Sequence, residues 1–202
     1  ARRVEYLPTV VDAERYPFVP QPGNAEPVIG WIGSPSTQQY VTELAPMIER
    51  IGKKHGARLV LVGARPDVAE RFGDLPVEVV PWSEDTEVEQ VARFDVGIMP
   101  LLDGPWERGK CGYKLIQYMA CGKPVIASPV GVNEKIVHGW NCGLLAGNHQ
   151  QWFEALDHLI CDADQRERLG QRGRDAVEKH YSMQVQAPRL VNIFNQAIAE
   201  TS

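Results

Sequence analysis

The chain has 202 residues, of which 44% are hydrophobic and 23% are charged, and its formal net charge is −5. This composition is typical of a soluble globular protein with one sizeable core. No block of basic or acidic residues stands out, so the charge pattern gives no reason to expect binding to nucleic acid or to an anionic membrane. No apolar run approaches the length of a transmembrane helix, and the first residues lack a signal-peptide pattern, so we expect a cytoplasmic protein.

The cysteines and histidines do not form a recognisable motif. Cys111, Cys121, Cys142 and Cys161 show no CxxC spacing, and we expect reduced thiols in or near the core. The five histidines are scattered, and no spacing pairs any of them with Ser, Asp or Cys. The sequence therefore predicts neither a metal site nor a catalytic triad.

The first 27 residues differ from the rest of the chain. Residues 7–27 contain five prolines and show no sustained periodicity, which indicates an arm or linker, with brief pairing expected in 4–11. From Pro27 onward, short apolar runs alternate with amphipathic segments. We therefore divide the chain into an interdomain linker or arm, residues 1–27, and one domain, residues 28–202.

The apolar runs predict buried parallel strands and the amphipathic segments predict helices. Strands are expected at 27–33, 57–63, 77–82, 95–101, 123–129 and 141–147. Helices are expected at 36–56, 65–74, 83–94 with Ser83 as N-cap, 110–121, 149–161, 164–180 and 183–199. This alternation predicts an α/β fold, a Rossmann-like, doubly wound parallel sheet of about six strands with helices on both faces.

The helix expected at 110–121 begins with an unusual concentration of positive charge. Ligands of such sheets bind at the carboxyl ends of the strands, where this helix begins. The positive charge of lysines at this helix end opposes the helix dipole, so a bound anion would compensate that charge. Free backbone N–H groups at the same end would also bind the anion. A solvated helix face is the alternative reading, and Glu107 could instead neutralise Arg108 or Lys110. The candidate diphosphate-binding residues are Gly33, Ser34, Lys110, Cys111, Gly112, Tyr113 and Lys114.

Two further positions at this edge have both a functional and a structural reading. The turn Gly33–Thr37 follows a strand and precedes a helix, but it is neither a Walker loop nor a GxGxxG motif, and a plain capped turn fits equally well. Trp82 follows the third strand, where its ring could stack on a base or serve as an apolar lid. Glu134 is expected to be a first-turn acid of the next helix.

Residues 113–145, YKLIQYMACGKPVIASPVGVNEKIVHGWNCGLL, closely resemble the C-terminal half of family-4 retaining glycosyltransferases with the GT-B fold. Residues 28–40 are similar to the first strand and phosphate turn of that half, and 77–82 to its third strand and base-binding loop. Residues 7–18 resemble the interdomain linker, so the resemblance spans almost the whole chain.

The resemblance implies a donor-binding domain that holds a UDP-, GDP- or ADP-sugar. It implies transfer with retention to a glycan or lipid-linked acceptor held by an N-terminal domain, with most catalytic residues there and no metal required. The 202 residues alone would then be inactive. The resemblance leaves open a peripheral association of the full-length protein with the inner membrane.

The sequence departs from the family pattern at two glutamates. Alignment on QYMACGKPV places Gln117 at the second glutamate, where it would bond the ribose, and Gly109 at the first, where no side chain can contact the sugar. The family often carries Arg and Lys near the first and second strands to bind phosphate. Residues 32–37, IGSPST, contain neither, and Lys110 and Lys114 would replace them. Trp82 is the candidate base-binding residue.

Two alternatives to a glycosyltransferase remain open. One is half of a nucleotide-sugar 2-epimerase, which shares the GT-B architecture but needs acid/base carboxylates and histidines that this sequence does not place. The other is a non-catalytic nucleotide-binding α/β module. Such a module would show no preference for nucleoside diphosphates over phosphate and would tolerate Lys114→Ala.

Overall fold

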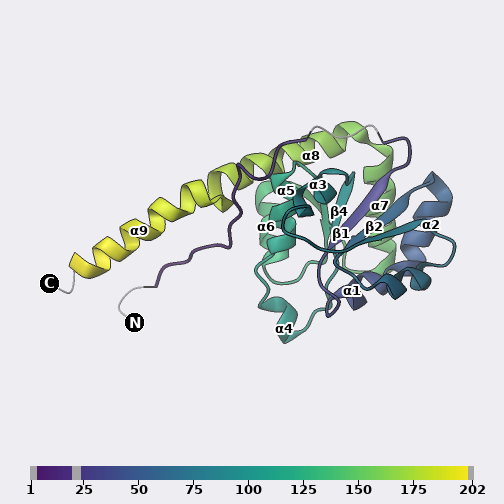
Figure 1. The fold of residues 1–202 in the computed structure, drawn as a ribbon, viewed down its shortest axis with the longest axis horizontal. Helices are drawn as coiled ribbons and strands as arrows, with labels where there is room; N and C mark the ends of the chain where they lie inside the picture. Colours follow the sequence, from purple (N-terminus) through teal and green to yellow (C-terminus); the bar gives the residue numbers. More distant parts are fainter. Residues whose placement is uncertain (1–3, 20–23, 200–202) are drawn as a thin grey trace.

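The computed structural model describes residues 4–19 and 24–199 and contains a six-stranded parallel sheet (Figure 1). The strand order is β3-β2-β1-β4-β5-β6, and all five neighbouring pairs are parallel. The strands are β1 Val28–Ile32, β2 Arg58–Val62, β3 Val77–Val80, β4 Val96–Met99, β5 Val125–Ala127 and β6 Gly143–Leu145. The order reverses between β1 and β4, so the switch point of this doubly wound sheet lies there.

Helices cover both faces of the sheet and form two hydrophobic clusters with it (Figure 1). One cluster contains apolar side chains of α2 and α7, and the other contains those of α3, α5 and α6. The helices are α1 Gln38–Thr42, α2 Ala45–His55, α3 Glu87–Ala92, α4 Pro105–Arg108, α5 Tyr113–Ala120, α6 Val132–Trp140, α7 His149–Cys161, α8 Ala163–Ala176 and α9 Met183–Ala199. The predicted fold class is confirmed, because the strand count, the parallel pairing and the two helical layers all match.

The helix expected at 36–56 is two helices, so its predicted continuity is wrong. Helix α1 ends at Thr42 and α2 begins at Ala45, with Pro46 in its first turn. Pro46 has no N–H to donate to the carbonyl of Thr42, and in a continuous helix its ring would clash with that carbonyl. The residues expected to form a helix at 65–74 form a 3-10 helix, η1 Pro66–Phe72.

Helix α5 begins at Tyr113 rather than at Lys110. Gly112, its N-cap, has φ 72°, a left-handed conformation that separates the helix from the preceding loop. Arg108 and Lys110 therefore lie outside the first turn of α5, and Arg108 ends the separate helix α4. Gln117 of α5, the candidate ribose-binding residue, is only 3% exposed.

The predicted N-cap of the helix expected at 83–94 was also wrong. Helix α3 begins at Glu87, and its N-cap is Thr86 rather than Ser83. Ser83 instead starts the turn before the helix, where its carbonyl accepts hydrogen bonds from the N–H groups of Thr86 and Glu87. Glu134 lies in the first turn of α6, as predicted.

The N-terminal arm packs on the domain. Val11 pairs with Ser182 in an isolated bridge, in line with the brief pairing expected for residues 4–11. Val11, Ala13 and Tyr16 are buried in the same core cluster as α5. The guanidinium of Arg174 in α8 donates to the carbonyls of Tyr16 and Ala120, which ties the arm to the end of α5.

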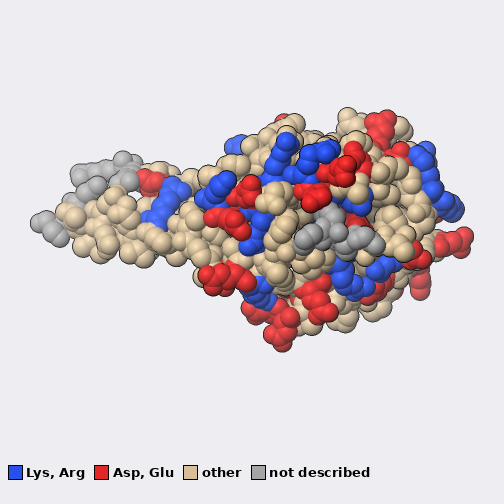
Figure 2. Space-filling model, turned by 90° about the horizontal axis from the view of Figure 1, so that it is seen from above, with Lys and Arg blue, Asp and Glu red and all other residues tan. Residues whose placement is uncertain are grey.

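At the other end of the chain, α8 continues through the π-helix η2, Val177–Tyr181, into α9. Helix α9 projects from the domain alongside the N-terminal arm and buries none of its described side chains (Figure 1). On the face in Figure 2 the projecting end is mostly uncharged, whereas acidic and basic side chains intermingle over the domain. None of the described helices is both long and apolar enough to cross a membrane.

All four cysteines are free thiols, but only two lie in the core. Cys121 and Cys142 are buried, as predicted. Cys111 and Cys161 are exposed, so the expectation of core or near-core positions was wrong for these two. Cys111 lies in the loop before α5 and Cys161 is the last residue of α7, and neither position faces the sheet.

Candidate functional site

A cavity of about 630 Å³ opens where β1, β2 and β3 end, beside the first turn of α5. We call it the strand-end cavity. Its lining includes six residues expected from the sequence to bind nucleotide: Gly33, Ser34, Trp82, Tyr113, Lys114 and Gln117. It also includes Gly63 and Thr37, the latter from the candidate turn Gly33–Thr37. Arg15, Glu84 and Glu87 line it as well, and for these three the sequence analysis proposed no ligand contact. The cavity therefore occupies the edge of the sheet where doubly wound folds bind ligands.

Two glycines bring the ends of β1 and β2 together at the cavity wall. Gly63 has φ 81°, and a Cβ atom there would lie 2.2 Å from the carbonyl oxygen of Gly33. A side chain at Gly63 would therefore meet both backbone strain and a clash with backbone. Glycine at this position leaves the main chain of the Gly33 turn facing the cavity.

The turn after β1 carries three hydroxyl groups. The Oγ atoms of Ser34 and Ser36 lie 2.9 Å apart, and the hydroxyl of Thr37 donates to the carbonyl of Ser34 over 3.1 Å. Ser34 and Thr37 both line the strand-end cavity. Hydroxyl and backbone N–H groups in such a turn can donate hydrogen bonds to an anion.

Lys114 brings a positive charge to this turn. Its Nζ atom lies 3.5 Å from Oγ1 of Thr37 and 4.8 Å from the centroid of the Trp31 ring. Among residues 4–19 and 24–199, no carboxylate lies within ion-pair distance of it. Burial, and to a smaller extent the charge of Lys110, lower the pKa of Lys114 to about 8. An anion in the cavity would stabilise the charged form of this side chain.

The other basic residues expected at the site lie elsewhere. The guanidinium of Arg108 forms an ion pair with Asp103, at 2.7 Å between Nε and Oδ1. Nζ of Lys110 lies 5.5 Å from the centroid of the Tyr40 ring. Lys110 and Cys111 line a second cavity of about 630 Å³, together with residues that include Tyr6, Gly131 and Lys135. Gly112 packs against α6. The structure thus separates Lys110 from Lys114.

A buried carboxylate organises the opposite side of the strand-end cavity. Glu87, the first residue of α3, is 5% exposed. Its carboxylate accepts hydrogen bonds from the hydroxyl of Tyr16 over 2.9 Å and from Nε1 of Trp82 over 2.8 Å. The Arg15 guanidinium lies 3.5 Å from the same carboxylate and also contacts Glu84. The arm, β3 and α3 are therefore linked through one side chain.

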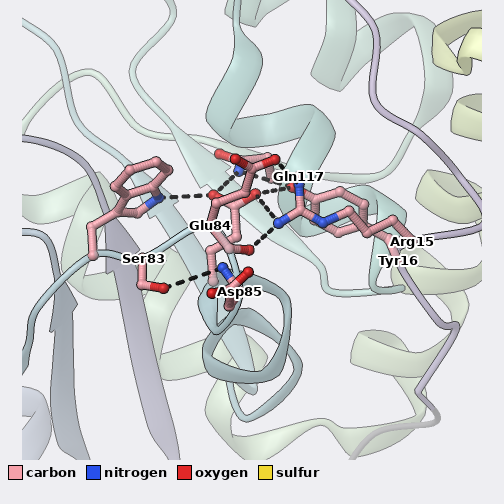
Figure 3. Close-up of polar contacts among 8 residues, drawn as sticks. Arg15, Tyr16, Ser83, Glu84, Asp85 and Gln117 are labelled. Carbon is pink, nitrogen blue, oxygen red and sulfur yellow. Dashed lines mark hydrogen bonds and ion pairs between the residues drawn. The ribbon is translucent and has the colours of Figure 1, made fainter.

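Gln117 of α5 completes this network (Figure 3). Its Nε2 atom lies 3.1 Å from the hydroxyl of Tyr16 and 3.3 Å from Oε2 of Glu87. The labelled side chains of Arg15, Tyr16 and Gln117 converge on one point in Figure 3. Burial raises the pKa of Tyr16, so its hydroxyl remains a donor to Glu87.

The sequence analysis missed Glu87 and Arg15 as cavity residues. It assigned Glu87 only to a helix expected at 83–94 and Arg15 to the linker at 1–27. Glu87 meets Tyr16 across 71 positions and Gln117 across 30. Local patterns do not report such distant contacts. The sequence held one signal for Glu87 as a cavity residue, namely that it follows the end of β3 at Val80 by seven residues.

Sequence spacing paired none of the histidines with Ser, Asp or Cys, but the fold brings His55 close to Asp157 and Cys161. His55, Asp157 and Cys161 place potential metal-ligating atoms within 4.8 Å of one another, and they form the only such group among residues 4–19 and 24–199. None of the three lines the strand-end cavity.

The strand order, the glycine-bounded turn and the strand-end cavity define a Rossmann-like domain with a cavity at the carboxyl ends of its strands. The sequence family described as glycosyl transferases group 1 matches residues 26–162. The chain therefore belongs to the group 1 glycosyltransferases. The expected resemblance to GT-B glycosyltransferases is confirmed at this level.

One curated relative matches most of the chain. D-inositol 3-phosphate glycosyltransferase of Mycobacterium bovis (strain BCG / Pasteur 1173P2) is 25% identical over 209 residues, which cover 89% of this chain and 42% of that protein. The chain therefore spans less than half of the length of this relative.

Two solved structures share the fold. Sucrose-phosphate synthase from Thermosynechococcus elongatus superposes with a TM-score of 0.74 at 22% identity, covering 96% of this chain and 52% of that one. Anabaena Alr3699/HepE, solved in complex with UDP and glucose, superposes with a TM-score of 0.69 at 19% identity. The superposition covers 95% of this chain and 54% of that one. At these identities the likeness establishes the fold.

Proposed function

We propose that this chain is the donor-binding domain of a nucleotide-sugar glycosyltransferase and that the strand-end cavity holds the nucleoside diphosphate of the donor. One observation carries the proposal. Lys114 keeps a positive charge in a partly buried position, at a turn rich in donors and without an ionic partner among the described residues. Because burying an uncompensated charge costs free energy, a ligand anion is the expected partner.

The diphosphate lies between Lys114 and the Gly33–Thr37 turn in this proposal. The ammonium group, the turn hydroxyls and the N–H groups at the start of α5 donate to the phosphate oxygens. When the sugar leaves, negative charge develops on the diphosphate, and these fixed donors stabilise it without a metal ion. Lys110, Cys111 and Gly112 do not line this cavity, so they contribute only at longer range.

The nucleoside extends toward Trp82 and Gln117. Trp82 is 54% exposed, which leaves ring surface for a base to stack on, while its Nε1 is held by Glu87. Nε2 of Gln117 already donates within the Glu87 network, so its amide oxygen is the atom that accepts from a ribose hydroxyl. Uridine is the first nucleoside to test, because Alr3699/HepE was solved with UDP.

The finer assignments remain part of the proposal. One assignment is that the enzyme transfers a hexosyl group with retention of configuration. Another is that the acceptor is a glycan or a lipid-linked molecule, bound by residues outside this chain. The finer assignments also include the cytoplasmic location and the inactivity of these 202 residues by themselves. The described residues that line the cavity include no histidine, which gives the alternative 2-epimerase chemistry less support.

The test is a calorimetric titration of the 202-residue chain with UDP, GDP and ADP, with inorganic phosphate as the control. We expect selective binding of one diphosphate, which Lys114→Ala weakens by about 1.5–3 kcal/mol, the value of a charged hydrogen bond. Lys110→Ala should cost less, since Lys110 lines the second cavity. Equal binding of phosphate and nucleotides would support a non-catalytic module instead. Unchanged affinity in Lys114→Ala would overturn the diphosphate assignment.

A further inference from the structure

Three side chains with different donor atoms meet where the last turns of α2 and α7 approach each other. His55 is the last residue of α2 and Cys161 the last residue of α7, while Asp157 lies one helical turn before Cys161. Nε2 of His55 lies 2.6 Å from Oδ1 of Asp157 and 4.0 Å from Sγ of Cys161. This group is unrelated to the strand-end cavity, and its imidazole, carboxylate and thiol are all ligands for zinc.

The two distances from His55 to the other ligand atoms are close to those of a tetrahedral zinc site. Zn–N, Zn–O and Zn–S bonds of about 2.0–2.3 Å place neighbouring ligand atoms about 3.4–3.6 Å apart. The His55–Asp157 separation must lengthen by roughly 0.8 Å and the His55–Cys161 separation must shorten by roughly 0.4 Å to match this geometry. Adjustments of this size need only small side-chain rotations, because Asp157 is partly exposed and Cys161 is exposed. The exposure also leaves room for water as a fourth ligand.

The electrostatic setting contains features that favour and features that oppose a cation. The carboxyl ends of α2 and α7 contribute partial negative charge, which favours a cation. The Oδ1 atom of Asp157 already lies 2.6 Å from Nε2 of His55, so the carboxylate and the imidazole face the same point. Against this, Nζ of Lys54 lies 2.7 Å from Oδ1 of Asp157 and competes for it. Lys54 is half exposed, so its ammonium can move into solvent.

We propose that His55, Asp157 and Cys161 form a binding site for a zinc-class divalent cation, with water completing the coordination. The cation displaces the hydrogen bond between His55 and Asp157 and the ammonium of Lys54. The thiol of Cys161 releases its proton to solvent as the Cys161–metal bond forms. Occupancy joins the ends of α2 and α7 and stabilises the folded chain by mass action.

Cobalt(II) is the probe, because it occupies zinc sites and gives a sulfur-to-cobalt charge-transfer absorption only with a thiolate ligand. The experiment titrates tag-free protein with Co²⁺ and then displaces the Co²⁺ with Zn²⁺. We expect the absorption to appear at one equivalent in the wild type and to disappear in Cys161→Ser. The matched control is Cys111→Ser, which removes the other exposed thiol and should leave the absorption unchanged.

Two further variants test the ligand set. Asp157→Asn should weaken Co²⁺ binding by at least about tenfold, since even loss of an outer hydrogen-bond partner costs that much. Lys54→Met should tighten binding, because it removes the competing ammonium. The proposal is overturned if the wild type shows no absorption, if the absorption survives Cys161→Ser, or if it depends on Cys111. Circular dichroism of each variant checks that the fold is retained.

Discussion

Replacing Lys114 by Met should make the folded chain more stable while it weakens ligand binding. Met keeps the length and apolar stem of the side chain but removes the charge. Burial lowers the pKa of Lys114 from 10.5 to about 8. Each tenfold change in proton affinity is worth about 1.4 kcal/mol, so the charge destabilises the fold by at most roughly 3 kcal/mol. Partial solvent screening reduces the expected gain in Lys114→Met to about 1–3 kcal/mol.

The gain should depend on pH with a defined sign. Because the folded-state pKa of Lys114 lies below the unfolded value, the unfolded chain binds more protons between pH 8 and 10.5. The cost of Lys114 is therefore fully present below pH 8 and is lost as the pH rises toward 10.5. Lys114→Met should stabilise the chain most at pH 7, with a gain that shrinks at pH 9.5.

Urea denaturation of the wild type and Lys114→Met at both pH values measures this difference directly. Lys53→Met removes an exposed lysine of α2 and is the matched control, expected to change stability by less than about 0.5 kcal/mol. The reasoning is refuted if Lys114→Met is less stable than the wild type at pH 7. It is also refuted if the gain at pH 7 does not exceed the gain at pH 9.5.

Three other substitutions or conditions test the site. Gly63→Ala should destabilise the chain by about 2 kcal/mol or more in urea denaturation, because residue 63 has a positive φ and its Cβ would clash with the Gly33 carbonyl. The control Gly139→Ala, at a position of α6 with open space around it, should not destabilise the chain. Glu87→Gln should cost about 1.5–3 kcal/mol in the same assay by weakening its charged hydrogen bonds, whereas the exposed Glu89→Gln should be near neutral. Calorimetric affinity for the bound diphosphate should fall about tenfold from pH 7 to pH 9 as Lys114 loses its proton, and a flat profile would contradict its role.

The strands were predictable because each is a short, mostly apolar run, and the inner strands β1, β4 and β5 are buried on both faces. The pattern of β1, VIGWI, shows this directly, since all five residues are buried. The strand order was not predictable from such runs, because it depends on which strand edges pair. The break at Pro46 could have been predicted from the missing N–H of proline, but the apolar periodicity on either side concealed it.

The candidate site was only partly predictable. The sequence placed Lys114 at the right edge of the sheet, but it could not separate it from Lys110, because the left-handed Gly112 moves the helix start by three residues. The Glu87 network and the His55 group depend on contacts between residues that are far apart in sequence. Only the folded chain brings those side chains together.

A crystal structure of the chain with the diphosphate that it binds most tightly would test the central claim most directly. We expect a phosphate oxygen within about 2.7–2.9 Å of Nζ of Lys114, as in charge-assisted hydrogen bonds, with the Gly33–Thr37 turn donating to the same diphosphate. A diphosphate bound in the second cavity against Lys110, with the strand-end cavity empty, would contradict the account.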